Sequence, residues 1–171
     1  MGVVKDPDNE QTLNRLISEY ERDLLRLCCV YLRDASLAQD AVQEMFLKAY
    51  RGLDSFRRES SERTWLVHIA MNVCRDMRRS AWFRYVDRRV ALEKLPLIAQ
   101  DASDVSVALM TEIMRLPRRE MEAVWLYYYE DMKLREIADA LGVTASAVGI
   151  RLSRARDRLR KALEGEEKKH A

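Results

Sequence analysis

The stretch KLREIADALGVTASAVGIRLSRARDRLRK, residues 133–161, holds two helix-length apolar patterns separated by a short turn. In the first pattern apolar residues recur every three or four positions, as one face of an α-helix requires: they are Leu134, Ile137, Ala138 and Leu141. Gly142 follows them, where a glycine can take the left-handed conformation that ends a helix. Thr144 is a suitable N-cap for a second helix. The stretch is therefore predicted to be a helix-turn-helix.

The second helix of this motif combines one apolar face with two basic flanks. Its apolar residues, spaced to pack against the first helix, are Val148, Leu152, Ala155 and Leu159. At about 100° per residue, arginines fall on both sides of that face: Arg151, Arg154 and Arg158 on one, Arg156 and Arg160 on the other. Such a helix can lie in a major groove, contact phosphates and present its outer residues to base edges. The alternative is an ordinary amphipathic terminal helix with a solvated face, which the glycine turn and the arginine density disfavour.

Composition and charge favour a helical protein with two polyanion contacts. The chain has 171 residues, 48% of them apolar, and its five glycines and three prolines leave little room for the turns of an all-β fold. An all-α fold is therefore predicted. The net charge is −2 over residues 1–52, +4 over 53–100, −4 over 101–144 and +4 over 145–171. Two basic segments separated by an acidic one indicate two contacts with a polyanion and acidic surfaces for another partner.

The sequence shows no sign of a membrane segment, a metal site or a cofactor site. No apolar run approaches the length that spans a bilayer, and the first residues lack the layout of a signal peptide, so a cytoplasmic protein is expected. The cysteines lie on apolar faces of predicted helices and are expected to be buried thiols: they are Cys28, Cys29 and Cys74. His68 and His170 are too scattered to be zinc ligands.

The first half of the chain is predicted to form three amphipathic helices. Apolar periodicity predicts the first over residues 12–32 and the third over 62–79. Ser36 and Gln39 fit a capping box, so the second is expected to begin near Leu37. The exposed side of the second helix is predicted to carry Asp40, Gln43 and Glu44. The third is predicted to bury Trp65, Leu66, Ile69, Ala70, Val73 and Met77.

A basic neighbourhood is predicted where the polar loop of residues 53–63 meets the third helix. Its members are Phe56, Arg57, Arg58, Arg63, Asn72, Arg75 and Arg79. Aromatic and amide groups among arginines suit single-stranded nucleic acid, whose unpaired bases stack or enter pockets while its phosphates are neutralised. A solvated charged helix is the alternative, and composition alone does not separate the two.

Weak periodicity after residue 80 predicts a linker and a second domain. The linker is expected to hold a short helix over residues 86–95 and to dock Trp82, Phe83 and Tyr85 onto the first domain. Further helices are predicted over 107–115 and 118–129, the latter burying Met121, Val124, Trp125 and Tyr128. The predicted organisation is a helical domain over residues 10–80, a linker over 81–106, a helix-turn-helix domain over 107–164 and a frayed polar tail over 165–171.

Several short motifs occur in a specific order between Leu13 and Leu163. They are DAVQEMFLKAY at residues 40–50, TWL at 64–66, IAMN at 69–72, DMRR at 76–79, LP at 116–117, EIA at 136–138 with LG at 141–142, and RLSRAR at 151–156. Each is weak alone. Their order and spacing together resemble the extracytoplasmic-function (group 4) sigma factors of bacterial RNA polymerase.

The resemblance implies a promoter-specificity subunit with no catalytic chemistry of its own. It implies docking of the second helix on the clamp of the polymerase β′ subunit through Asp40, Gln43, Glu44 and Phe46. It implies that the loop and the third helix melt and read the −10 element through Phe56, Arg57, Arg58, Arg63, Asn72, Arg75, Asp76 and Arg79. It implies that the helix-turn-helix reads the −35 duplex through Thr144, Ser146, Ile150, Arg151, Ser153, Arg154 and Arg158.

The same resemblance implies further partners. These are the polymerase β flap, promoter DNA and an anti-sigma factor, which leaves open retention of the protein at the membrane. The linker would then thread toward the polymerase active-site channel. Ile150 departs from the small polar or basic residue usual in the family, and a thymine methyl group suits it as a partner.

Two other functions are weighed against this one. A polymerase-independent helix-turn-helix regulator would need a dimerisation element, because paired half-sites demand a two-fold partner. The sequence is expected to supply neither a heptad segment nor a long terminal helix for this purpose. A metal- or thiol-dependent enzyme would have to be built on Cys28, Cys74 and His68, which show no ligand spacing.

Overall fold

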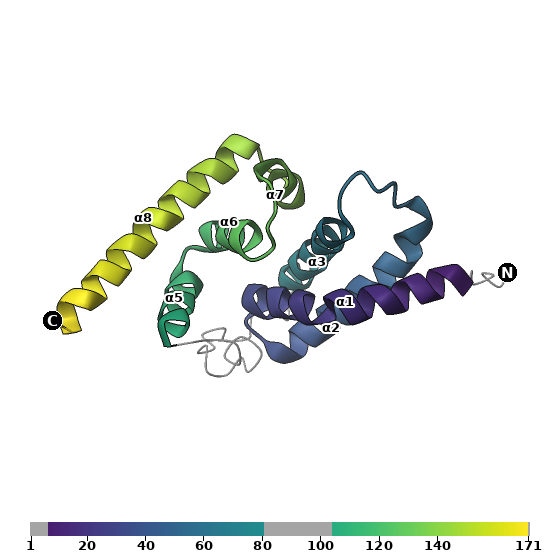
Figure 1. Cartoon of the computed structure of the whole chain (residues 1–171), viewed down its shortest axis with the longest axis horizontal. Coiled ribbons are helices and arrows are strands. Elements are labelled where there is room, and N and C mark those ends of the chain that lie inside the picture. The colour runs from purple at the N-terminus through teal and green to yellow at the C-terminus, as the bar shows by residue number, and fades with distance from the viewer. Residues whose placement is uncertain (1–6, 81–103, 171) are drawn as a thin grey trace. The chain divides into compact units, whose positions relative to one another are not determined.

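The computed structural model describes residues 7–80 and 104–170, and every regular element in these ranges is a helix (Figure 1). The chain divides into two compact units, residues 1–90 and 91–171. The predicted all-α class, with two helical domains of which the second is a helix-turn-helix, is confirmed. None of the described helices has the length and apolar character needed to cross a bilayer. The helix predicted over residues 86–95 and the docking of Trp82, Phe83 and Tyr85 lie outside the described residues.

In the described part of the N-terminal unit, residues 7–80, the α-helices are α1 (Pro7–Leu32), α2 (Ala35–Gly52) and α3 (Glu62–Arg79). A short 3-10 helix, η1 (Leu53–Ser55), follows α2. Each of the three α-helices packs against the other two. The buried residues of α2 are Ala38, Ala41, Val42, Met45, Phe46 and Ala49, all spaced for one helix face, while Tyr50, which the same spacing predicts to lie inward, is only partly buried.

Two predictions about helix starts in this unit are wrong. α1 begins at Pro7, earlier than residue 12, in keeping with the preference of proline for the first turn of a helix. The N-cap of α2 is Asp34, whose carboxylate accepts a hydrogen bond from the backbone N–H of Leu37 at 2.9 Å. Asp34 lies directly after a residue with positive φ, so it meets the free amides of α2 before Ser36 can.

The buried face of α3 is wider than the sequence pattern predicts. It contains Leu66, Val67, Ala70, Met71, Val73 and Cys74. Trp65, Ile69 and Met77, which were predicted to be buried, are only partly covered. Because α3 packs against both α1 and α2, it buries two adjacent faces, and the partly covered residues lie at their margin.

The three cysteines lie in the core of the N-terminal unit as buried thiols, as expected. The Sγ atoms of Cys28 and Cys74 are 3.5 Å apart. Burial, with smaller contributions from Asp34 and Cys74, raises the pKa of Cys29 to about 11. A thiol with so high a pKa stays protonated and unreactive at neutral pH. Within the described ranges, no group of three or more His, Cys, Asp or Glu side chains is arranged to hold a metal ion.

Over residues 104–170, the described part of the C-terminal unit, the helices are α5 (Asp104–Arg115), α6 (Arg118–Tyr128), α7 (Leu134–Leu141) and α8 (Ala145–His170). α8 packs against each of the other three. α5 begins before the predicted residue 107, and α8 continues through the segment predicted to be a frayed tail. The principal core residues are Ile113, Met121, Val124, Trp125, Leu126, Ile137, Val148, Leu152 and Ala155. Tyr128 was predicted to face inward, but it is 54% exposed.

The turn between α7 and α8 has the geometry predicted for a helix-turn-helix. Gly142 adopts φ 65° and ψ 39°, the left-handed conformation that glycine tolerates best. The N–H of Val143 reaches back to the carbonyl of Ala138 at 3.0 Å, which closes the end of α7. Thr144 Oγ1 accepts a hydrogen bond from the N–H of Ala147 at 3.1 Å, so Thr144 is the N-cap of α8 as predicted.

Replacing Gly142 by alanine is expected to destabilise the C-terminal unit, since a Cβ is unfavourable at positive φ even where no neighbouring atom blocks it. If the free energy of unfolding of this unit falls by about 1 kcal/mol, amide hydrogen exchange in α7 and α8 should become about fivefold faster. Gly149→Ala is the matched control: it lies within α8 with open space around its Cβ position, and should slow exchange. Equal effects of the two variants would contradict the backbone argument.

Candidate nucleic-acid interface

One side of α8 carries exposed residues that no other described element covers. Ser146, Ile150, Ser153 and Arg154 recur at three- or four-residue steps and are all exposed, Ile150 by 50%. The buried residues Val148, Leu152 and Ala155 occupy the opposite side of the helix. Exposed Thr144 and partly exposed Arg151 flank the outer side. The arrangement leaves a short polar and apolar strip, edged by arginine, available to a groove in duplex DNA.

Arg158, whose contact with phosphate stays a prediction, pairs with a buried carboxylate in its own unit. Its Nε lies 3.0 Å from Oε2 of Glu120 on α6; the side chain of Glu120 is 9% exposed and that of Arg158 60%. The two atoms are not aligned as a hydrogen bond, so charge attraction joins them. Without Arg158 a carboxylate would be left buried with no opposite charge, which is unfavourable.

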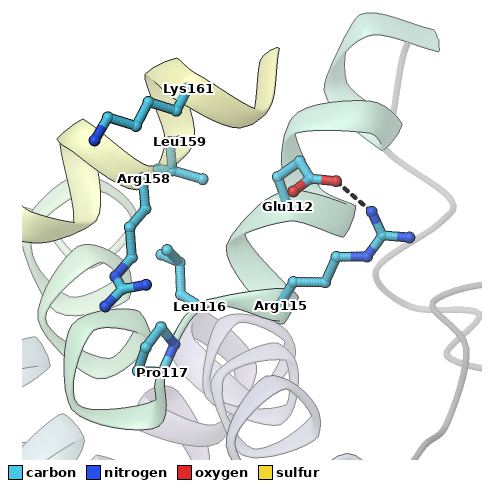
Figure 2. Close-up of a pocket in the computed structure, with 7 residues that line it drawn as sticks. All are labelled: Glu112, Arg115, Leu116, Pro117, Arg158, Leu159 and Lys161. Atoms are coloured by element: carbon cyan, nitrogen blue, oxygen red, sulfur yellow. Dashed lines mark hydrogen bonds and ion pairs between the residues drawn. The ribbon is translucent and has the colours of Figure 1, made fainter. Parts of the chain in front are cut away.

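Figure 2 shows the surroundings of Arg158, a hollow of about 280 Å³ lined by residues of α5, the α5–α6 turn and α8. The guanidinium of Arg158 extends past Leu116 toward Pro117, while Arg115 turns to its own ion pair with Glu112. The arginine therefore belongs to the packing of α8 on its neighbours as much as to the surface. Sequence spacing indicated its side of the helix but not its partner.

The other basic flank of α8 also interacts within the unit. Arg156 Nε donates a hydrogen bond to the hydroxyl of Tyr128 at 2.8 Å, and the guanidinium lies 5.8 Å from the ring centres of Tyr127 and Tyr128. Tyr128 thus supports α8 through its hydroxyl instead of through core packing. Arg160 pairs with Asp157 at 2.9 Å. Among the described residues Arg154 has no ion-pair partner, whereas Arg158 and Arg160 each pair with a carboxylate and Arg156 is bonded to a tyrosine.

In the N-terminal unit the candidate surface is formed by the α2–α3 loop, residues 53–61, and by the outer side of α3. Phe56 stacks on Trp65, with ring centres 4.4 Å apart and planes at 21°. Arg57 and Arg58 are exposed, and Arg58 has a φ of 57°, an unfavourable conformation for a residue with a side chain. The loop therefore has one aromatic anchor and one strained residue among solvated charges.

The outer side of α3 presents the predicted polar residues in a single stripe. Asn72, Asp76 and Arg79 are exposed, while Arg75 is partly covered. Asn72 Nδ2 lies 3.3 Å from Nδ1 of His68 one turn earlier, and the charges of Asp76 and Arg79 lie 3.9 Å apart. The stripe offers hydrogen-bond donors and acceptors and charges of both signs. Base edges can be recognised by the hydrogen-bonding groups, and phosphates by the positive charge.

Three polar pairs, which sequence reasoning missed, join α1 to the α2–α3 loop and the start of α3. They are Asn9 with Asp54 at 2.7 Å, Arg15 with Glu62 at 2.7 and 3.0 Å, and Asp23 with Arg63 at 3.3 Å. The partners are separated by 40 or more positions in the chain, so no local pattern could reveal them. Arg63, predicted to contact nucleic acid, thus has a carboxylate neighbour in its own domain.

The exposed side of α2 carries the predicted acidic and amide groups. Asp40 and Gln43 are exposed and Glu44 is partly exposed. Phe46 is only 6% exposed and lies in a groove of about 780 Å³ between α1 and α2, so it offers little surface to a partner. The adjacent Leu47, which was not singled out, is 53% exposed and lines the same groove.

Comparison with known proteins identifies both units. The sigma-70 region 2 family matches residues 16–84, and the sigma-70 region 4 family matches residues 106–159. The ECF RNA polymerase sigma factor SigW of Bacillus subtilis is 30% identical over 86% of this chain and 87% of its own length. This chain belongs to the ECF sigma factors. It is a promoter-specifying subunit of RNA polymerase, and a polymerase-independent regulator is not favoured.

Other relatives agree with this assignment. SigM of Mycobacterium tuberculosis, another ECF sigma factor, is 32% identical over 88% of this chain and 76% of its own length. RNA polymerase sigma-H factor of Pseudomonas aeruginosa is 28% identical over 91% of this chain and 88% of its own length. The sigma factor RpoE of Bartonella quintana, solved with the anti-sigma factor NepR, has the same fold: TM-score 0.70, 24% identity, with 93% of this chain and 98% of that chain covered.

The ion pairs of α8 predict unequal contributions of its arginines to DNA binding by this sigma factor. Arg154→Ala should lower the slope of log affinity against log salt concentration by about one unit, because its free guanidinium can displace a counterion. Arg158→Ala should lower it less, because Glu120 already balances that charge. Binding of the full chain to duplex DNA is measured over a salt series, with Arg160→Ala, whose charge pairs with Asp157, as the control. Equal losses for Arg154 and Arg158 would show that Arg158 leaves Glu120 for phosphate.

Proposed function

We propose that the sigma factor reads a promoter at two places, with the duplex −35 element contacted by α8 and the melted −10 strand contacted by the α2–α3 loop and α3. The observation that carries this proposal is the separation of faces on α8. Its apolar side is buried in the unit, while Ser146, Ile150, Ser153 and Arg154 are left outward on a helix-turn-helix with the expected turn. A groove in duplex DNA accepts such a helix.

The proposed −35 contacts divide into base-facing and phosphate-facing residues. Ser146, Ile150 and Ser153 lie at the centre of the outer strip, where a helix in the major groove meets base edges. Exposed Ile150 suits a thymine methyl group, since it offers no hydrogen bond. Arg151 and Arg154 lie at the edge, where they can contact phosphates, and the free N-terminal amides of α8 beside Thr144 can do the same.

The proposed −10 contacts come from the N-terminal unit, over residues 10–80. The N-terminal unit presents exposed Arg57 and Arg58 beside the stacked rings of Phe56 and Trp65, and the polar stripe of Asn72, Asp76 and Arg79 continues along α3. A single strand offers unpaired bases to polar groups and phosphates to arginines. The mixture of aromatic, amide and basic groups supports recognition of a melted strand there.

Core polymerase is proposed to dock on the exposed side of α2. Asp40, Gln43 and Glu44 give this side an acidic, hydrogen-bonding character, and exposed Leu47, one turn further along α2, supplies an apolar contact. An interface of this kind combines a small apolar centre with a charged rim. The β′ clamp is the proposed partner of α2, and the β flap is proposed to bind the C-terminal domain, over residues 107–164.

An anti-sigma factor is proposed as the regulatory partner. The Bartonella quintana RpoE structure, which shares this fold, was solved with the anti-sigma factor NepR bound. A binder that covers the acidic side of α2 or the outer strip of α8 would block polymerase or promoter contacts directly. The chain is proposed to act in the cytoplasm, where core polymerase and promoter DNA are found.

Promoter-dependent transcription with purified core polymerase tests the proposal. The full chain should enable run-off transcription from a library of promoter-like DNA, and core enzyme alone should not. Asp40→Arg combined with Glu44→Arg should weaken binding to core at least about tenfold through charge repulsion, with the helical content unchanged. Lys168→Glu, which reverses an exposed charge outside both proposed polymerase-binding regions, is the control. If the double variant bound core polymerase as tightly as the wild type, the acidic side of α2 would not be part of the docking surface.

A further inference from the structure

The strongest of the three pairs between α1 and the α2–α3 loop region is the one between Arg15 and Glu62. Nη1 and Nη2 of Arg15 donate hydrogen bonds to Oε2 and Oε1 of Glu62 at 3.0 and 2.7 Å, which makes a bidentate salt bridge, called the fork below. Glu19, one turn along α1, accepts a third bond from Arg15 at 3.0 Å. Such a fork fixes the direction of the guanidinium as well as its distance, in contrast to a single-contact ion pair.

Glu62 is the first residue of α3, so the fork acts where the loop ends. The preceding residue, Ser61, caps α3 through its hydroxyl, which accepts from the N–H of Thr64 at 3.1 Å. The hydrogen bond from Arg15 holds the pKa of Glu62 below its ordinary value, although partial burial acts in the opposite direction. The carboxylate therefore stays charged and bound to α1 at neutral pH.

The fork also decides which arginine Glu62 attracts. Arg58 in the loop is close enough to lower the pKa of Glu62 by charge attraction, but no hydrogen bond joins the two among the described residues. With both oxygens of Glu62 occupied by Arg15, Arg58 remains exposed at φ 57°. Removal of Arg15 would leave Arg58 as the nearest cation for a carboxylate that has lost its partner.

The loop itself has few means of holding one conformation. Its residues 56–61, FRRESS, include one apolar side chain, Phe56, which stacks on Trp65 of α3. The remaining residues are polar, and ordering them costs conformational entropy that solvated charges do not offset. Anchors at the ends of the loop are therefore what restricts it, and Arg15 provides the firmest.

We infer that Arg15 is a positioning residue for −10 recognition: through its fork to Glu62 it holds the α2–α3 loop in the conformation that reads the melted strand. The inference rests on the proposed role of that loop, and extends the recognition machinery to a helix that carries none of the proposed DNA contacts. Arg15 itself binds protein, with both terminal nitrogens engaged by carboxylates. The loop side chains, not Arg15, would touch the bases.

The test uses full-length Arg15→Gln and Glu62→Gln, each of which removes one side of the fork. Arg15→Lys keeps the charge but supplies no planar fork, so it should give an intermediate result. Arg22→Gln, which removes the same charge from an exposed site on the same helix, is the matched control. Arg15 lies on the surface, and circular dichroism should show that all variants keep their helices.

The first readout is independent of transcription. Amide hydrogen exchange in residues 56–61 should become at least about fivefold faster in Arg15→Gln and Glu62→Gln than in the wild type, with α1 and α2 unchanged. Carbon-13 NMR should place the pKa of Glu62 below its ordinary value in the wild type and show it raised in Arg15→Gln, because the hydrogen bonds and the charge of Arg15 are lost. Unchanged loop exchange would overturn the inference whatever the loop does at a promoter.

The second readout is the base preference at each −10 position, measured as the ratio of run-off product from matched promoters with core polymerase. The ratio should fall at least about threefold in Arg15→Gln, with −35 preference and core affinity unchanged. Faster loop exchange with an unchanged ratio would overturn the positioning role. A uniform loss on all promoters would indicate a general defect and overturn it as well. If the wild type shows no −10 preference, the proposed function fails, whereas the exchange result still reports whether Arg15 anchors the loop.

Discussion

Burial of one face on each helix decides which side chains this sigma factor can offer to polymerase and promoter. On α8, Val148, Leu152 and Ala155 must lie inward, and the helix period then directs Ile150 and Arg154 outward. The same constraint leaves the acidic side of α2 exposed. The proposed recognition residues on α2 and α8 are thus presented by rigid helices whose orientation the core fixes, which limits the entropy lost on binding.

Where a periodic pattern was strong, the sequence alone predicted the structure well. The helix-turn-helix, the left-handed Gly142 and the Thr144 cap are local features with local causes, and the structure confirms each of them. Predictions failed where two local signals competed or where a helix met two neighbours. Asp34 displaced Ser36 as a cap because it lies closer to the turn, and α3 buries a wider face than a single stripe because α1 and α2 both cover it.

The missed parts of the candidate site are polar contacts between distant segments. In the sequence, nothing distinguishes Glu120 from an ordinary surface glutamate. In the structure it is 7% exposed and pairs with Arg158 on α8. Helix geometry indicated the side on which Arg158 lies, but not that a carboxylate from α6 would face it. Arg15 and Glu62 present the same difficulty across α1 and α3. Such pairs depend on packing between elements, which no periodic pattern encodes, so a basic residue in the sequence is not thereby a free cation.

The stacked pair of Phe56 and Trp65 limits how the N-terminal unit can receive an unpaired base. Phe56 already has an aromatic partner at 4.4 Å, so a base that stacked in its place would first have to break that contact. Trp65 also lies against Gly52, where an added Cβ would be 3.4 Å from its ring, and is held from a second side. The two rings are therefore better suited to bound the side of a base-binding surface than to stack on an incoming base. Under the proposed function, base selection on this surface then falls to polar groups, of which Arg57 and Arg58 are the ones whose placement depends on the loop.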